Sequence, residues 1–316
     1  MKLLWAMSIY QVAIILLLIA SRCSCKECSV TEHEINPLLQ RLIRIATNLD
    51  QEPDPATFLA LRLARRHNLQ IEKQLLDQLK KTIVDKVTKG EDVPFYLTVR
   101  YALAFRSACL NPASISHNTK NVDLVKMVKD KLDLEIRNIE AKGQPLTDFY
   151  QISSAILVLC FEEKNAPTYI VQDIIYRALR RQAPFITPVD INAASMTVLA
   201  FTCLHRIPFK SIASLWIERA IVRLLLIILS YQGKNNLFAT VCATPLAVQA
   251  LHVTHQMPSR PFKCTNNLQR LLIEVPKGTF NTPKKLFHVI PTFEGISMLQ
   301  IGNQTCDSSQ GILVLD

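Results

Sequence analysis

The sequence predicts an all-α protein whose helices form an α/α toroid, a closed ring of inner and outer helices. The 316 residues include only seven glycines. No segment alternates Val, Ile or Thr with polar residues as a strand would, and apolar residues recur at helical spacing almost everywhere. In addition, apolar helical segments alternate with one-sided, charged ones, which is the pattern that two concentric layers of helices require.

The two kinds of helix are recognised by their composition. Charged, amphipathic helices are expected at 71–87, 122–141 and 169–181. Nearly apolar helices, rich in small residues, are expected at 57–64, 97–110, 150–161, 193–204 and 245–253. A helix that is apolar all round must be buried, whereas a one-sided helix covers it from outside. The apolar helices recur about every 42–50 residues, so about five repeats are expected to close the ring. An open solenoid is the competing architecture.

The N-terminus has the form of a secretory signal. A basic start precedes an apolar run over 3–20, and small polar residues follow it. We therefore expect residues 1–25 to be a signal peptide and residues 26–316 to form a single toroid domain. A transmembrane anchor is the alternative, although Gln11 interrupts the run. The most apolar later run, 224–229, follows three charged residues, so no membrane span is expected after signal cleavage.

The cysteines indicate an extracellular, secreted protein. Nine occur, and signal cleavage leaves seven in an oxidising compartment. No CxxC pair remains and no Cys/His cluster has zinc spacing, so long-range disulfides are favoured over a metal site. Cys109, Cys160 and Cys203 lie toward the C-terminal ends of apolar helices, which predicts that they share one rim of the ring. The sequon at Asn303 is typical of a secreted glycoprotein.

The formal net charge of +10 raises the question of a nucleic-acid partner. The basic residues are scattered over several helices, with no aromatic-interleaved stripe and no nucleic-acid motif. Solvated outer faces explain the charge better, and no nucleic acid is expected to bind.

Four segments carry motifs that occur together, in this order, in one family. Residues 147–151 read Thr-Asp-Phe-Tyr-Gln and are followed by Cys160. This resembles the family pattern Thr-x-Tyr-Tyr-Gln…Cys. Residues 193–204 resemble the helix that follows a Val-Asp-Thr motif. Residues 238–249 are similar to Phe-Gly-Asn-Val-Tyr-Ser-Thr-Pro-Leu-Ala-Leu-Gln, and residues 277–291 to Gly-x-Phe-x-x-Pro…Leu-Pro. From about residue 28 to 306, the chain thus resembles the helical domain of the eukaryotic cobalamin transport proteins: transcobalamin, intrinsic factor and haptocorrin.

The resemblance implies a disulfide pairing. In the family three bridges staple the helical domain, and by position they fall on Cys28–Cys264, Cys109–Cys306 and Cys160–Cys203. Cys242 is then left alone, at a place where the family has Tyr.

The resemblance also implies a set of ligand-contacting residues. Thr147, Tyr150 and Gln151 match a corrin-contacting segment, whose hydroxyls and amide suit the amides at the corrin periphery. The family's acidic contact falls on Asn192 when counted back from Cys203, or on Asp190 when Val189-Asp190 is taken as the motif. At two further contact positions this chain has a different polar residue: Thr240 stands where the family has Asn, and His288 where it has Gln. At two more it has an apolar residue: Ala243 stands where the family has Ser, and Leu97 where it has Gln.

The function implied is that of a secreted cobalamin-binding and transport protein. In the family, cobalamin lies between this helical domain and a smaller β domain, which is expected to be absent because the chain stops at Asp316. A cell-surface receptor or a separate β-domain chain is a further partner to consider. The stretch just ahead of Asn192, residues 185–189, contains no His, so protein imidazole on the cobalt is not expected. The alternative is an interaction protein that has lost cobalamin binding. An enzyme is not expected, since the facing acidic pair of a toroidal hydrolase is missing.

Overall fold

The computed structural model describes residues 28–303, except 49, 165, 186–187, 207–212, 255–261 and 263. The expected signal peptide lies outside the described residues. The sequon is only partly covered: Asn303 ends the last described helix, and Thr305 lies beyond it.

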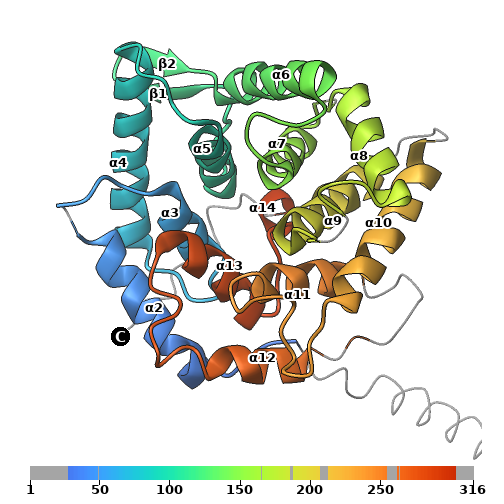
Figure 1. The fold of residues 1–316 in the computed structure, drawn as a ribbon. Helices are drawn as coiled ribbons and strands as arrows, with labels where there is room; N and C mark the ends of the chain where they lie inside the picture. The colour runs from blue at the N-terminus through green and yellow to red at the C-terminus, as the bar shows by residue number, and fades with distance from the viewer. Residues whose placement is uncertain are drawn as a thin grey trace, which may run out of the picture.

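Within the described part of the chain, the inner layer is a closed ring of six helices (Figure 1). They are α3 (Pro55–Arg62), α5 (Phe95–Ser107), α7 (Phe149–Phe161), α9 (Ile191–Arg206), α11 (Thr244–Val253) and α13 (Pro283–Phe293). Each packs against the next, and α13 packs against α3. This last contact closes the ring, so the α/α toroid is confirmed and the open solenoid is wrong.

A second layer of helices surrounds the ring (Figure 1). It consists of α2 (Glu32–Ala46), α4 (Leu69–Thr88), α6 (Leu124–Lys142), α8 (Thr168–Arg180), α10 (Ala213–Ser230) and α12 (Thr265–Leu272). The layers differ as the composition predicts. Every residue of α7 from Ile152 to Phe161 is buried, whereas α4 buries a single face that includes Leu75, Leu79 and Ile83, four residues apart.

The ring has one more inner helix than the five expected, because the sequence of α13 matches a family motif but does not have the pattern of an apolar helix. It is short and contains Pro291. A second correction is a small antiparallel hairpin, β1 (Ile115–His117) and β2 (Lys120–Val122). The helix expected from 122 accordingly begins later, at Leu124, where the Asp123 side chain caps it by accepting from the Lys126 N–H at 2.8 Å.

A final short helix, α14 (Gln300–Asn303), packs against α5 and lies near the middle of the ring in Figure 1. Gly302 meets the ring of Phe161 at the C-terminal end of α7. A Cβ on Gly302 would lie 2.4 Å from Phe161 Cδ1, so only glycine allows this approach. The C-terminal segment therefore packs at the rim where the inner helices end.

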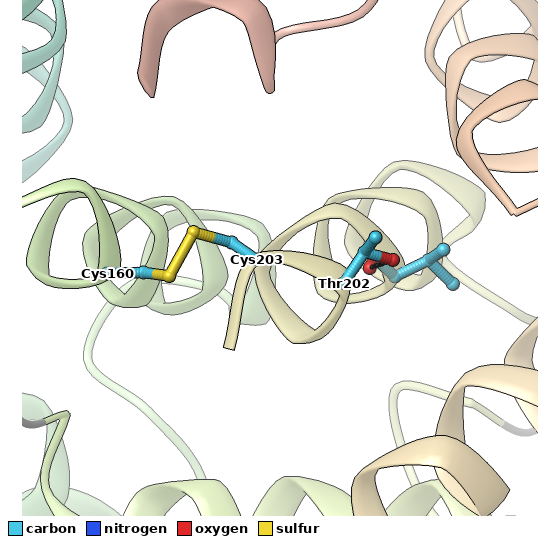
Figure 2. Close-up of a disulfide and its surroundings, with 4 residues drawn as sticks. Cys160, Thr202 and Cys203 are labelled. Atoms are coloured by element: carbon cyan, nitrogen blue, oxygen red, sulfur yellow. Dashed lines mark hydrogen bonds between the residues drawn. A yellow bond between two sulfur atoms is a disulfide. The ribbon is translucent and has the colours of Figure 1, made fainter. Parts of the chain in front are cut away.

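Two of the expected disulfides are formed. Cys160–Cys203 joins the ends of the neighbouring inner helices α7 and α9 (Figure 2), and Cys28–Cys264 joins the segment before α2 to the start of α12. Cys109 is disulfide-bonded, and its expected partner Cys306 lies outside the described residues. Among the described cysteines, Cys242 alone is free.

Candidate functional site

A pocket of about 290 Å³ opens at the rim where the inner helices begin. We call it the rim pocket. The beginnings of four inner helices line it: Asp148 and Tyr150 at α7; Asp190 and Asn192 at α9; Cys242 and Pro245 at α11; Thr282, Lys284, Lys285 and His288 at α13, with Phe280. Side chains far apart in sequence therefore converge on one polar cavity.

Two carboxylates hold fixed positions in the rim pocket because they cap helices. Asp148 precedes α7, and its Oδ1 accepts from the Gln151 N–H at 2.7 Å. Asp190 precedes α9, and its Oδ1 accepts from the Ala193 N–H at 3.0 Å. Both carboxylates are stabilised by the positive end of the helix dipole. Each retains acceptor capacity on its side chain.

The half-buried Tyr150 and the buried His288 form a hydrogen-bonded pair at the rim pocket. The Tyr150 hydroxyl lies 3.0 Å from His288 Nε2. Burial lowers the pKa of His288 to about 3, helped by the charges of Arg100 and Lys284, and burial raises the pKa of Tyr150 to about 12. Both groups are therefore neutral near pH 7. The Lys284 ammonium lies 5.7 Å from the centre of the Tyr150 ring and adds a cation–π contact.

Gln151 lies just beside the rim pocket. With Tyr150 and Arg100 it lines a small adjoining cavity of about 20 Å³. Its Nε2 donates to Asp148 Oδ2 at 3.3 Å, whereas its Oε1 is buried without a hydrogen-bond partner. An unpaired buried acceptor is costly, so this amide oxygen is available to a donor that enters.

Two residues named from the resemblance do not line the rim pocket. The Thr147 hydroxyl donates to the buried Glu135 at 2.7 Å and ties the loop before α7 to α6. The exposed Thr240 forms the turn before α11, where its hydroxyl accepts from the Ala243 N–H at 3.1 Å. The other five, Tyr150, Gln151, Asp190, Asn192 and His288, lie in or beside the pocket.

The sequence reasoning missed the two lysines, Asp148 and Cys242 as lining residues. Lys284 and Lys285 follow Thr282-Pro283, a helix-start signal that places them in the first turn of α13. Asp148 lies inside the matched motif, at its variable position. Cys242 is left without a disulfide partner by the family pattern, which gives it no expected role.

The described residues contain no group of three or more His, Cys, Asp or Glu side chains placed to hold a metal ion. None of the helices described is both long and apolar enough to cross a membrane. The geometry thus defines a class: a disulfide-stapled α/α toroid with a polar pocket at one rim.

Comparison with known proteins gives this class its family. The model of a family described as "Eukaryotic cobalamin-binding protein" matches residues 10–316. Rat cobalamin binding intrinsic factor is 25% identical over 276 residues, covering 85% of this chain and 60% of the relative. Human transcobalamin-1 is 25% identical over 304 residues, covering 91% and 67%. The chain belongs to the eukaryotic cobalamin-binding protein family.

A solved structure agrees in fold. The crystal structure of haptocorrin in complex with Cbi superposes with a TM-score of 0.71 at 22% identity, covering 92% of this chain and 74% of that one. The chain spans about 60% of the length of rat intrinsic factor and 63% of human intrinsic factor. The family description is that of binding proteins, which agrees with the expectation of a binding protein and not an enzyme.

Proposed function

We propose that this chain is a secreted protein that binds a cobalamin-type corrinoid at the rim pocket. One observation carries the proposal: four residues named from the family resemblance, Tyr150, Asp190, Asn192 and His288, line a single cavity. Membership of a cobalamin-binding family supports the choice of ligand.

The chemistry of the lining suits the amides at the edge of a corrin. Asp148 and Asp190 accept from amide N–H groups, and Lys284 donates to amide carbonyls. Asn192 does both. The unpaired Oε1 of Gln151 accepts one further hydrogen bond. These groups stand on helix starts, so the protein does not need to reorganise to present them.

The rim pocket is small for such a ligand. At about 290 Å³ it stands at the lower end of the roughly 300–1,000 Å³ of typical ligand pockets. We propose that it holds one edge of the corrin and that a second surface covers the rest. A separate β-domain chain or a cell-surface receptor would provide that surface. As organisation we propose a signal peptide over 1–25 and one toroid unit over 26–316, glycosylated at Asn303.

The cobalt of the ligand is not expected to receive a protein imidazole. His288 is the histidine that lines the rim pocket, and it is buried and paired with Tyr150. Coordination of cobalt by His288 would require its Nε2 to break the hydrogen bond with the Tyr150 hydroxyl. We therefore propose that the protein holds the ligand by its periphery and leaves the metal to the ligand's own groups or to solvent.

One observation favours a second function, an interaction protein without a vitamin. The Tyr150–His288 hydrogen bond and the Lys284 contact with the Tyr150 ring satisfy the centre of the rim pocket with no ligand bound. In that case the toroid would serve as a rigid, secreted scaffold.

Titration of the purified protein with cyanocobalamin separates the two functions. Visible absorption follows the corrin and calorimetry follows the heat of binding. Saturable binding at one site, with no spectral change typical of a protein imidazole on cobalt, is the expected result. The scaffold function prevails if neither signal responds at millimolar ligand.

A further inference from the structure

A second pocket lies on the outer layer, between the C-terminal end of α8 and the second half of α10. We call it the α8–α10 pocket. It measures about 200 Å³ and shares no lining residue with the rim pocket. Phe185, Leu226 and Ile227 form apolar parts of its wall, and Arg181 and Arg223 bring two guanidinium groups to it.

The guanidinium groups of this pocket have no partner within the described chain. Arg223 Nε is buried and makes no hydrogen bond. No ion pair involves Arg181 or Arg223 among the described residues, and Arg181 is exposed at the left-handed end of α8. A buried donor left unpaired destabilises the protein. An incoming acceptor would therefore remove a cost that the free protein carries.

The wall that carries Arg181 is held in place by local hydrogen bonds. Arg177 accepts at its carbonyl from the Gln182 N–H at 2.9 Å, and its guanidinium donates to the Ala183 carbonyl at 3.2 Å. The Phe185 N–H donates to the Gln182 carbonyl at 2.7 Å. The pocket is thus formed before any ligand arrives.

The two helices that form this pocket, α8 and α10, also carry exposed aromatic and basic side chains. Tyr176 and Trp216 are 51% and 42% exposed. Arg180 lies over the Tyr176 ring at 5.7 Å, and Arg219 lies over the Trp216 ring at 4.9 Å. Leu226, in the pocket wall, is 41% exposed. Aromatic residues and arginine are the side chains that protein interfaces concentrate and that carry most of their binding energy.

The charge of this surface is one-sided. On α8, the carboxylate of Asp173 is already paired with Arg177 at 2.6 Å. Glu218 is then the one other acidic residue of α8 and α10, and four arginines without an ion pair among the described residues stand against it: Arg180, Arg181, Arg219 and Arg223. An acidic partner complements such a surface, and a basic one is repelled.

We propose that the α8–α10 pocket binds a carboxylate side chain of an acidic protein segment that carries an apolar residue next to it. The planar guanidinium groups suit a carboxylate, which accepts two parallel hydrogen bonds. The apolar wall accommodates the neighbouring side chain. A flat anionic membrane fits less well, because the arginines line a concavity of the size of one or two side chains. This interaction does not depend on corrinoid binding.

Fluorescence anisotropy with the full secreted chain tests the proposal. The probe is a fluorescein-labelled peptide in which glutamates and leucines are spaced by glycine. The control probe replaces every glutamate by lysine. We expect saturable binding of the acidic peptide alone, weakened at least tenfold by Arg181→Gln with Arg223→Gln, and weakened by added salt.

A matched variant controls for net charge. Lys129→Gln with Arg137→Gln removes the same charge from exposed positions on α6 and should leave binding unchanged. Arg181→Gln alone, at an exposed residue, should weaken binding severalfold if the double variant fails to fold. Circular dichroism verifies the helical content of each protein.

Three results would overturn the proposal. One is the absence of binding to the acidic peptide at millimolar protein and low salt. Another is an equal loss in the α6 control variant, which would mean diffuse attraction. The third is binding to phosphatidylserine-containing vesicles with none to the peptide, which would assign the surface to a membrane.

Discussion

The Tyr150 hydroxyl lies 3.0 Å from His288 Nε2 and links the first turn of α7 to the middle of α13, 138 residues later in the chain. Both positions were expected to contact a ligand, yet here they contact each other. Because both groups are neutral near pH 7, the hydrogen bond carries no net charge. On the proposed function, a ligand that enters the rim pocket would meet a preformed pair and add its bonds around it, through Asp190, Asn192, Gln151 and the acceptor capacity that the Tyr150 hydroxyl retains.

The first prediction concerns the ligand contacts. Replacing Tyr150 and Gln151 together by alanine should weaken cyanocobalamin binding about tenfold or more. Each lost hydrogen bond costs roughly 0.5–1.5 kcal/mol, and about 1.4 kcal/mol corresponds to a decade in Kd. Calorimetric titration measures the change.

A matched double variant on the outer layer provides the control. Gln172→Ala with Tyr176→Ala removes the same two side chains from exposed positions on α8 and should bind as the parent does. The single variant Gln151→Ala removes the acceptor without disturbing His288. Unchanged affinity in the Tyr150/Gln151 double variant would mean that the ligand binds elsewhere.

The second prediction concerns acid stability. Burial lowers the pKa of His288 to about 3 in the folded protein, against 6.5 for a free histidine. At pH values between these two, the unfolded state binds a proton on His288 and the folded state does not. The free energy of unfolding therefore falls as the pH falls from about 6.5 toward 3. For one such group the slope reaches at most about 1.4 kcal/mol per pH unit.

Urea unfolding at several pH values tests this, by comparing the parent with His288→Gln. The variant should lose less stability than the parent on acidification across this window. The rest of the chain is the same in both proteins, so only the difference between them reports on His288. Parallel curves would contradict the buried, neutral histidine.

The third prediction ranks the disulfides. Cys160 and Cys203 are 43 residues apart, whereas Cys28 and Cys264 are 236 apart. In the chain-entropy model, bridges closing such loops contribute about 4 and about 5.5 kcal/mol to the free energy of unfolding. Paired Cys→Ser variants should thus be destabilised more by loss of Cys28–Cys264. The opposite ranking in reversible urea unfolding would contradict the entropic account.

The fourth prediction uses the free thiol. Cys242 is exposed and lines the rim pocket. A maleimide should modify it in the native protein, and saturating cyanocobalamin should slow that reaction severalfold. Peptide mapping locates the label, and Cys242→Ser provides the unlabelled control. Equal rates with and without the corrinoid would place the ligand away from α11.

The fold was largely accessible from the sequence because it depends on burial. The contrast between apolar segments such as 150–161 and amphipathic ones such as 71–87 follows directly from which faces are covered. The hairpin at 115–122 could not be predicted, because only six residues pair and their composition is not typical of strands. The helix α13 could not be recognised from the sequence, because Pro291 interrupts its helical pattern of apolar residues.

The site was accessible in part. Asp190 and Tyr150 follow from motifs, because a helix start fixes where their side chains lie. The Tyr150–His288 hydrogen bond could not be predicted, since it depends on how closely α7 and α13 approach across the ring. Thr147 shows the reverse case: its motif matched, but the buried acceptor Glu135, twelve residues earlier, binds its hydroxyl.

The contact between α13 and α3 also sets the order in which the molecule can be assembled. The first inner helix packs against the last described inner helix, and the Val30 N–H donates to the Phe293 carbonyl at 2.8 Å. Contacts this distant in sequence form slowly, because a long loop must close before they stabilise anything. During synthesis the apolar face of α3 stays uncovered by α13 until more than two hundred further residues have emerged. The nascent chain will therefore expose an apolar edge that a chaperone can bind until the ring closes.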